Sequence, residues 1–330
     1  MPFRNIIGHA AVVDLLRQAA RRNRVPQSLL FAGPDGVGKR AVATALAQAV
    51  NCPNRADGDA CGTCPVCSRI ARGQFSDVTW LEKGSEASIK IKPLRERILD
   101  VVGYRPFEGA RRVYIIEPAD ELTLEAQDAL LKTLEEPPPA AMLILITAYP
   151  DTLLPTIQSR CRRLRFGLLS EHDVARVLAE RAGVDARTAA RLAAVSGGSV
   201  SRALSEETGD FDDDRAAALG LLRAARGTNM AERLKASAAL AQHGSKRRDR
   251  EALSARLTIL SSLLRDLSAL SASSDVALAN TDLDADLRSL LGSFQANRLV
   301  DAFDLVDRAE HALGRNASPK IVADWLGAGI

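Results

Sequence analysis

Apolar residues along this chain follow two different spacings, and the change between them divides the sequence. In the first half, short apolar runs alternate with segments in which apolar residues recur every three or four positions. The short runs predict strands and the wider spacing predicts helices, an alternation typical of a mostly parallel sheet with crossover helices. The predicted strands are Ser28–Ala32, Asp77–Leu81, Arg112–Glu117, Ala141–Thr147 and Arg162–Phe166, and the predicted helices are Lys39–Val50, residues 91–101 and Leu124–Glu136.

After Phe166 the pattern predicts helices alone. A chain of 330 residues exceeds what one hydrophobic core usually fills, and the low aromatic content of 4% favours helices packed through aliphatic faces. We therefore expect an α/β P-loop domain over residues 1–167, a small helical lid over 168–208 and an all-α domain over 209–330. The predicted helices of the last two parts are Glu171–Ala182, Asp185–Val195 and residues 213–225, 229–242, 249–271, 285–292, 296–313 and 319–326.

Residues 33–40, Gly-Pro-Asp-Gly-Val-Gly-Lys-Arg, match a phosphate-binding loop at every required position except the last. In such a loop, backbone N–H groups surround the phosphates, the lysine neutralises them, and a final Ser or Thr hydroxyl ligates Mg²⁺. Arg40 stands where that hydroxyl is required, and a cation cannot ligate a metal. The sequence leaves open whether ATP or ADP binds, and whether Arg40 enters the Mg²⁺ position or points to solvent. The predicted cradle residues are Gly33, Gly36, Gly38, Lys39 and Arg40.

A second motif of nucleotide hydrolysis is altered as well. The predicted strand 112–117 ends in Glu117-Pro118, where a working enzyme would carry Asp-Glu to hold Mg²⁺ and polarise the attacking water. Glu117 could still reach a metal through water, but Pro118 cannot act as a base. Because hydrolysis needs both the metal and an activated water, we expect no intrinsic ATP turnover.

Four cysteines lie within sixteen residues, and their spacing predicts a metal site. Eight, two and two residues separate them, and thiolates so spaced can close a tetrahedral shell around Zn²⁺. A catalytic zinc is not expected, because four cysteines leave no open position for water or substrate. The alternative is a set of free thiols on a disordered loop. The predicted ligands of one structural zinc, in an insertion over residues 51–70, are Cys52, Cys61, Cys64 and Cys67.

Charge and hydropathy say little about partners. The net charge of +3 neither demands nor excludes a nucleic acid, because phosphate binding depends on local basic patches. The N-terminus shows no basic-then-apolar signal pattern, and no stretch approaches the roughly 20 apolar residues that span a bilayer. We therefore expect a cytoplasmic protein that does not enter a membrane.

Several of these segments together resemble one known family. The resemblance covers residues 1 to about 205 and, more weakly, the close of the chain. The chain is similar to the clamp-loader AAA+ proteins of bacterial DNA replication. Within this family, its impaired nucleotide motifs resemble the delta-prime branch of the DNA polymerase III clamp loader rather than the gamma/tau motor subunits. The segments that carry it are Ile6-Ile7-Gly8, the four cysteines, residues 129–138 (Ala-Leu-Leu-Lys-Thr-Leu-Glu-Glu-Pro-Pro), Ser159-Arg160-Cys161 and residues 316–320 (Asn-Ala-Ser-Pro-Lys).

The resemblance implies roles for three further residues, each with an ordinary alternative. Arg160 would be an arginine finger offered in trans to ATP on a neighbouring subunit, where an always-charged guanidinium forks onto phosphate oxygens. Its alternative, within a basic run, is a solvated surface or a nucleic-acid contact. Thr147 would be sensor 1, or simply a strand-ending hydroxyl. Arg202 would be sensor 2 of the lid, or a residue that packs the lid.

By resemblance, the function would be that of a non-catalytic stator subunit with a helical collar that oligomerises. Its partners would be the gamma/tau motor subunits and the delta subunit, which together load the sliding clamp on primed DNA. One alternative is an ATP-hydrolysing motor subunit in which Glu117 serves the metal. Another is a zinc-containing DNA-binding adaptor. Two features of the zinc segment argue against it: the acidic residues Asp57 and Asp59, and the lack of a predicted groove-reading helix.

Overall fold

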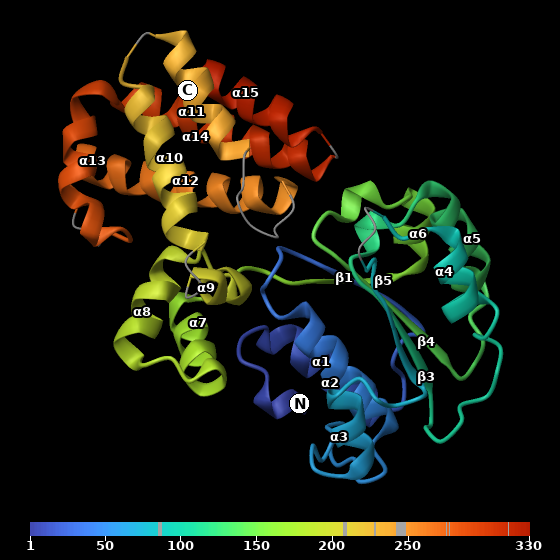
Figure 1. Cartoon of the computed structure of the whole chain (residues 1–330). Coiled ribbons are helices and arrows are strands. Elements are labelled where there is room, and N and C mark those ends of the chain that lie inside the picture. The colour runs from blue at the N-terminus through green and yellow to red at the C-terminus, as the bar shows by residue number, and fades with distance from the viewer. Residues whose placement is uncertain are drawn as a thin grey trace. The chain divides into compact units, whose positions relative to one another are not determined.

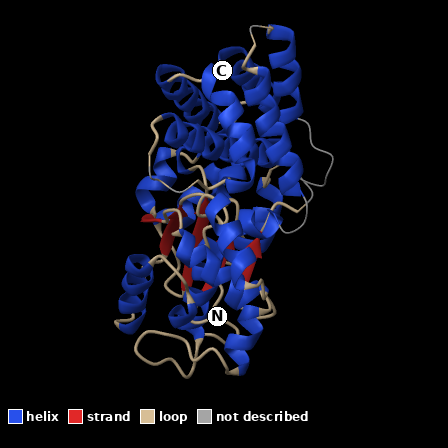
Figure 2. Ribbon diagram, turned by 90° about the vertical axis from the view of Figure 1, so that its left-hand side faces the viewer, coloured by secondary structure: helices blue, strands red, loops and turns tan. Residues whose placement is uncertain are grey.

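The computed structural model describes residues 1–330 except 85–87, 207–209, 228, 242–248, 275, 277 and 316. The chain divides into two compact units, Met1–Asp173 and Val174–Ile330. The described strands all belong to the first unit, and the second is helical (Figure 1, Figure 2). The predicted boundary at 208/209 and the first residue of the 316–320 motif lie outside the described residues. The separation of a lid from a collar therefore stays a prediction.

Five strands form one parallel sheet, in the order β2-β3-β4-β1-β5. Registers such as Ala32↔Thr147 and Ile116↔Leu145 bring the carboxyl ends of neighbouring strands to the same edge. This sheet confirms the predicted fold class and the five predicted strands, although Asp77, Glu117 and Phe166 fall just outside them. The strands are β1 (Ser28–Ala32), β2 (Val78–Leu81), β3 (Arg112–Ile116), β4 (Ala141–Thr147) and β5 (Arg162–Arg165).

Helices cover both faces of this sheet, because successive strand residues point to opposite sides. Leu29 and Phe31 of β1 belong to one hydrophobic core with α1 and α2, while Leu30 between them belongs to a second core with α5 and α6. Figure 1 shows the two groups of helices on opposite sides of the strands. The helices are α1 (Ala10–Arg21), α2 (Lys39–Asn51), α3 (Pro65–Ala71), α4 (Ile91–Leu94), α5 (Leu124–Glu135) and α6 (Pro155–Arg160), with single turns at Phe3–Asn5, Ala119–Glu121 and Pro150–Thr152.

The observed helices of the first unit differ from the predicted ones in four places. The segment 91–101 forms only α4 and a wider π-helical turn over Arg95–Leu99. Helices α3 and α6, with seven and six residues, are too short to give a periodic signal. Helix α1 was missed although Val12, Val13 and Leu16 stand at helical spacing.

The second unit consists of helices that begin at the boundary between the units. The predicted helix Glu171–Ala182 forms α7 only as far as Val177 and continues as a π-helical turn, the other predicted helices are confirmed with ends shifted by up to three residues, and α9 is additional. No helix in the described ranges is both long and apolar enough to cross a membrane. The helices are α7 (Glu171–Val177), α8 (Ala186–Val195), α9 (Val200–Glu206), α10 (Asp210–Ala224), α11 (Met230–Ala241), α12 (Asp249–Ser271), α13 (Asp284–Leu290), α14 (Ala296–Gly314) and α15 (Pro319–Gly329), with single turns at Leu178–Ala182, Thr281–Leu283 and Leu291–Ser293.

A buried ion pair joins three helices of this unit. The Nε of Arg256 on α12 donates to Oδ1 of Asp214 on α10 at 2.6 Å, and both side chains are at least 93% buried. The same guanidinium donates to the carbonyl oxygens of Ala239 and Leu240 on α11. Since a buried charge is costly, removal of one partner takes a close counter-charge away from the other.

We expect Arg256→Ala to lower the free energy of unfolding of the second unit by about 3–5 kcal/mol, because the buried carboxylate of Asp214 loses the guanidinium that it meets at 2.6 Å. Urea unfolding followed by the fluorescence of Trp325, in a Trp80→Phe background, measures the change. The matched control is Arg288→Ala, which removes an exposed pair with Asp284 and should cost about 0.5 kcal/mol or less. Equal effects of the two substitutions would contradict the prediction that the buried pair contributes more to the free energy of unfolding than the exposed pair.

Candidate functional site

The phosphate-loop segment forms a cradle at the carboxyl edge of the sheet. Strand β1 ends at Ala32, and α2 begins at Lys39. Gly38 precedes the helix with a φ of 102°, a conformation that a residue with a side chain rarely adopts. A Cβ on Gly33 would lie 2.1 Å from the carbonyl oxygen of Phe166. Both glycines are therefore required by the backbone of the loop itself.

The lysine of the cradle is turned back onto its own loop. Lys39 is only 4% exposed, and its Nζ donates to the carbonyl oxygens of Gly33 and Pro34, the latter at 2.7 Å. Asp35 contributes a carboxylate oxygen at 3.4 Å. Burial lowers the pKa of Lys39, and the nearby carboxylates oppose that shift. The ammonium group that would meet a phosphate is thus already provided with protein acceptors.

Arg40 reaches across the carboxyl ends of the neighbouring strands, with 54% of its side chain exposed. Its Nη1 donates to Oε2 of Glu117 at 2.8 Å and also to Glu82. The guanidinium carbon lies 4.1 Å from the centre of the Trp80 ring. Glu117 follows β3 and Glu82 follows β2, and the register Leu81↔Ile116 brings these two strand ends side by side. The predicted cradle residue and the degenerate acidic residue are therefore joined directly.

These residues do not fit a Mg²⁺ ion. Magnesium at a phosphate loop is held by a hydroxyl at the last position and by an acidic residue at the end of the neighbouring strand. Here the position of the hydroxyl carries a guanidinium, and that guanidinium binds the acidic residue. Burial raises the pKa of Glu117, and Arg40 opposes the shift by favouring the carboxylate. Glu117 is thus already paired with a protein cation.

Thr147 lies at the same edge, in contact with a residue that the sequence analysis did not single out. Its Oγ1 donates to Oδ1 of Asp120 at 2.5 Å and accepts from the backbone N–H of Tyr149 at 2.9 Å. Burial raises the pKa of Asp120, whose carboxylate also acts on the charge of Lys39. The signal that could have found Asp120 is its position three residues after Glu117, past the end of a predicted strand.

Arg160 lies at the amino ends of the strands, whereas this cradle lies at their carboxyl ends. It is the last residue of α6, and β5 begins two residues later with Arg162 paired to Leu29 near the start of β1. The cradle follows the other end of β1, roughly 10 Å further along the strand direction. The Nη2 of Arg160 donates to Oε1 of Glu135 at 2.5 Å, and one third of the side chain is exposed. Arg160 and Lys39 are therefore not brought together within one chain.

Arg202, the predicted sensor 2, and Cys161, next to Arg160, both contact other parts of the protein. Arg202 on α9 donates from Nη1 to the carbonyl oxygen of Ser196 at 3.1 Å, and its charge acts on the carboxylate of Glu310 on α14. Burial raises the pKa of Cys161 to about 12, so this thiol stays protonated at neutral pH. The sensor roles of Thr147 and Arg202 stay predictions.

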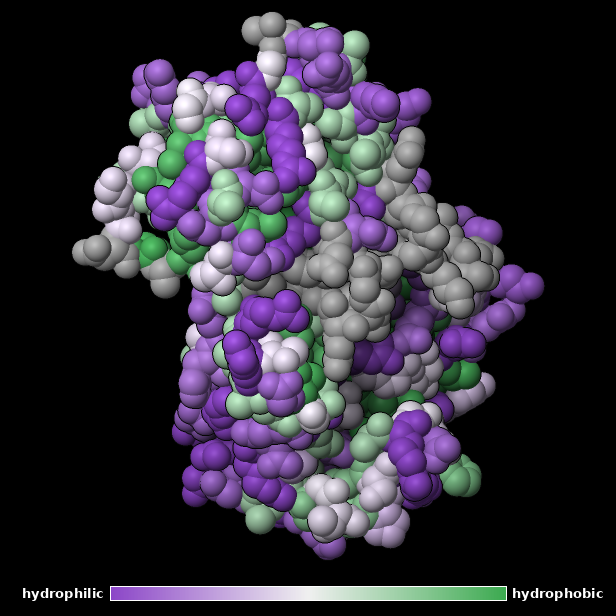
Figure 3. Space-filling view, turned by 60° about the vertical axis from the view of Figure 1, so that its left-hand side comes forward, coloured by the Kyte–Doolittle hydropathy of each residue, from purple (hydrophilic) through white to green (hydrophobic). Residues whose placement is uncertain are grey.

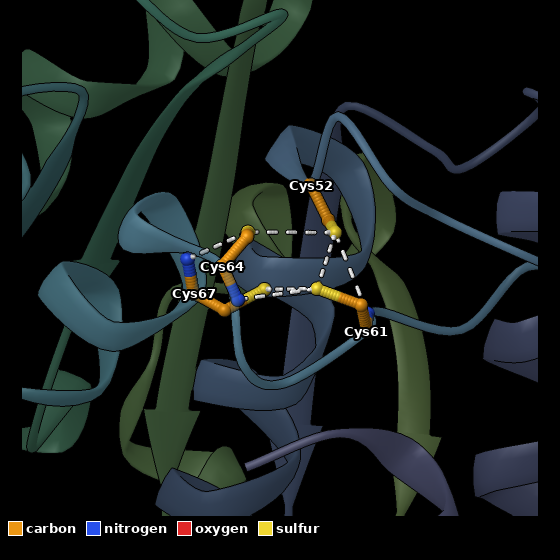
Figure 4. Close-up of side chains that lie close together, drawn as sticks. All are labelled: Cys52, Cys61, Cys64 and Cys67. Atoms are coloured by element: carbon orange, nitrogen blue, oxygen red, sulfur yellow. Dashed lines mark hydrogen bonds between the residues drawn. The ribbon is translucent and has the colours of Figure 1, made fainter.

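The four predicted metal ligands converge (Figure 4). Cys52 follows α2, Cys64 precedes α3, and Cys67 lies in its first turn. Their Sγ atoms and that of Cys61 all lie within 4.8 Å of one another. The Sγ atom of Cys52 lies 3.6 Å from that of Cys61 and 3.9 Å from that of Cys64. Disulfides have S–S lengths of about 2.05 Å, whereas four thiolates about 2.3 Å from a central ion are separated by roughly 3.8 Å.

Backbone donors also favour thiolates in this cluster. The N–H groups of Cys61, Cys64 and Cys67 point to the Sγ atoms of Cys52, Cys61 and Cys64 at 3.3–3.4 Å. The donor on Cys64 is the largest cause that lowers the pKa of Cys61, to about 6, whereas burial raises the pKa of Cys52 and that of Cys67. The donor set and its geometry fit one metal ion in a closed shell, and the four side chains could hold it without further ligands.

The cluster is attached to the beginning of the chain through Asp59. This carboxylate, only 7% exposed, accepts from the backbone N–H of Phe3 at 2.7 Å and from Nη1 of Arg4 at 3.0 Å. Arg4 in turn donates to the carbonyl oxygens of Ala60 and Cys61. Asp57 in the same segment is exposed and pairs with Arg21 at 3.1 Å. Asp59 thus holds the N-terminal segment against the cysteine cluster through hydrogen bonds.

We expect Asp59→Asn to loosen the N-terminal segment while the metal content stays at wild-type level, because the substitution removes a charged acceptor but no thiol. Hydrogen exchange at Phe3 and Arg4 should accelerate about tenfold, as loss of a charge-assisted hydrogen bond implies. Peptide-resolved exchange and elemental analysis measure the two quantities, with Asp57→Asn as the control. Loss of metal together with faster exchange would show that Asp59 supports the cluster and not the N-terminal segment alone.

Comparison with known proteins gives one family and several relatives. Residues 8–170 match the family model described as DNA polymerase III, delta subunit. The DNA polymerase III subunit delta' of Pseudomonas aeruginosa is 40% identical over 151 residues, which cover 44% of this chain and 45% of that protein. The subunit tau/gamma of Haemophilus influenzae is 34% identical over 177 residues, 54% of this chain and 25% of that protein.

These matches cover only part of each protein. The matched segments span between a quarter and a half of the length of the curated relatives. Among solved structures, a DNA polymerase III gamma subunit-related protein from Thermotoga maritima is 19% identical, covers 95% of this chain and 97% of its own, and has a TM-score of 0.42. That value is too low to add to the assignment, which rests on the sequence matches. Residues 8–170 belong to the family of DNA polymerase III clamp-loader subunits.

Proposed function

We propose that this chain is a delta-prime-type stator, a clamp-loader subunit of DNA polymerase III that does not itself hydrolyse ATP. The observation that carries the proposal is the separation of two motifs on one sheet. Arg160 is partly exposed at one edge, and the cradle with Arg40 in place of the hydroxyl lies at the other. A residue so placed can serve a nucleotide only on another subunit.

The surroundings of Arg160 suit an arginine finger. Its guanidinium follows a short helix and precedes a strand paired to β1, so its backbone is fixed on both sides. Glu135 and the carbonyl oxygen of Thr156 each accept one hydrogen bond from it. A γ-phosphate offers more charge and more acceptor oxygens than one carboxylate, so exchange of partners on assembly would be favourable.

The remaining partners follow from the family. We propose that the chain assembles with gamma/tau motor subunits and a delta subunit, and that it meets the sliding clamp and primed DNA through that complex. The collar would be residues 209–330 of the helical second unit. Figure 3 shows hydrophobic side chains in small areas among hydrophilic ones. The apolar side chains that are exposed on α14 and α15, and so available for subunit contacts, include Val300, Ile321 and Trp325.

We also propose that the metal in the four-cysteine cluster is Zn²⁺, because a closed tetrahedral shell of four thiolates is the usual structural zinc site. It would cross-link the segment after α2 to α3 and leave no open position for chemistry. The adaptor alternative gains no support from this segment. Its helix α3 has seven residues, and Arg69 on it is bound at both terminal nitrogens by Glu108.

We expect Arg160→Ala to remove the catalytic contribution of one ATP site in a loader reconstituted with motor subunits, clamp and primed DNA. Arginine fingers supply about 10³-fold or more in rate, so the share of phosphate released at that site in a single-turnover experiment should disappear. Lys39→Ala should leave the amplitude of phosphate release unchanged. Arg162→Ala is the control for loss of a neighbouring surface charge.

Other outcomes assign the chain to another class. If Lys39→Ala removes a share of turnover and Arg160→Ala does not, the chain is a motor subunit. If the isolated chain binds primed DNA tightly and with a steep dependence on salt, the adaptor function is favoured instead.

A further inference from the structure

The altered last position of the phosphate loop has a partner in the structure. In a loop that binds magnesium, the hydroxyl at this position and the acidic residue at the end of the neighbouring strand approach one ion. Here they approach each other, since Arg40 Nη1 lies 2.8 Å from Glu117 Oε2. We propose that Arg40 is a built-in cation that takes the place of Mg²⁺, so that the cradle is held together without metal and excludes magnesium-bound nucleotides.

Two residues that no motif indicates hold Arg40 in this position. Glu82 accepts a second hydrogen bond from Nη1, and the face of Trp80 lies 4.1 Å from the guanidinium carbon. Both come from the end of β2, next to the strand that ends before Glu117. An aromatic face and two carboxylates suit a planar guanidinium, which stacks and donates at the same time. They would not suit the compact ammonium group of a lysine equally well.

The charges around the cradle also favour the exclusion of magnesium-bound nucleotides. Lys39 and Arg40 face four carboxylates, those of Asp35, Glu82, Glu117 and Asp120. In an active cradle, a metal and the lysine together balance the phosphates and the acidic residues. Here the acidic residues are in excess of the protein cations, so an added polyphosphate meets repulsion that no metal is placed to relieve.

The loop itself adds a third reason. Lys39 Nζ is bound to Gly33 and Pro34 oxygens, and it would have to leave both acceptors in order to reach a phosphate. Movement of Lys39 alone would not suffice, because Arg40 would still occupy the metal position. The inference concerns the ligand of this chain's own cradle, and it holds whether or not Arg160 acts on a neighbouring subunit.

The experiment uses Trp80 as a local reporter. The sequence has two tryptophans, so a Trp325→Phe background leaves Trp80 alone. Energy transfer from Trp80 to the N-methylanthraniloyl derivative of ADP then measures occupation of the cradle, with Mg²⁺ or with EDTA. We expect wild type to show no magnesium-dependent transfer. Arg40→Ser restores the hydroxyl and frees Glu117, and it should bind the Mg²⁺ complex of the probe at least about tenfold more tightly, a gain of about 1.4 kcal/mol.

Control variants locate the effect. Arg72→Ser, which removes an exposed arginine after α3, should behave as wild type. Addition of Lys39→Ala to Arg40→Ser should abolish the gained transfer if the probe lies in the cradle. Thermal unfolding and metal content of each variant establish that it is folded.

Two results would overturn the proposal. One is magnesium-dependent binding of the probe by wild type as tight as that by Arg40→Ser, and the other is a folded Arg40→Ser that gains no binding. Should Arg40→Ser not fold, a Mn²⁺ titration of wild type gives the answer by itself. Quenching of Trp80 at micromolar Mn²⁺ would mean that the metal position is open, whereas an unchanged signal supports its occupation by Arg40.

Discussion

The parallel direction of all five strands is the constraint on which the arrangement of this chain depends. Because neighbouring strands run the same way, their carboxyl ends share one edge, and the segments after β1, β2, β3 and β4 meet there. Lys39, Arg40, Glu82, Glu117, Asp120 and Thr147 are brought together for this reason. The same constraint sends α6 and the start of β5 to the other end of the strands, so that Arg160 and the cradle of one chain lie apart.

The cradle and the cysteine cluster show two ways to stabilise a loop around a cation. At the cluster, four thiolates at tetrahedral distances can share one metal ion, and backbone N–H groups support them. At the cradle, a covalently attached guanidinium provides the positive charge, with Glu117, Glu82 and Trp80 around it. A metal can be lost or exchanged, whereas a side chain cannot, so the second solution would suit the stator that we propose.

Patterns with a strong local cause were predicted well. Strands β1, β3 and β4 follow from runs of apolar residues that are buried on both sheet faces, and the convergence of the four thiols follows from cysteine spacing. Helices α3 and α6 escaped because a segment of six or seven residues contains too few apolar positions to show a period. The π-helical turn after α4 could not be read from apolar spacing, which continues through it unchanged.

The sequence by itself determined the fold class, the composition of the cradle and the identity of the four thiols, because each depends on residues close together in the chain. It left two positions open for Arg40, and it gave no reason to consider Glu82, Trp80 or Asp120. The tertiary structure supplied Glu117, Glu82 and Trp80 as partners of Arg40, which come from strands or strand ends 40 and more residues away. It also decided that Arg160 and Lys39 lie apart, because only the pairing of β5 with β1 fixes which edge of the sheet each of them occupies.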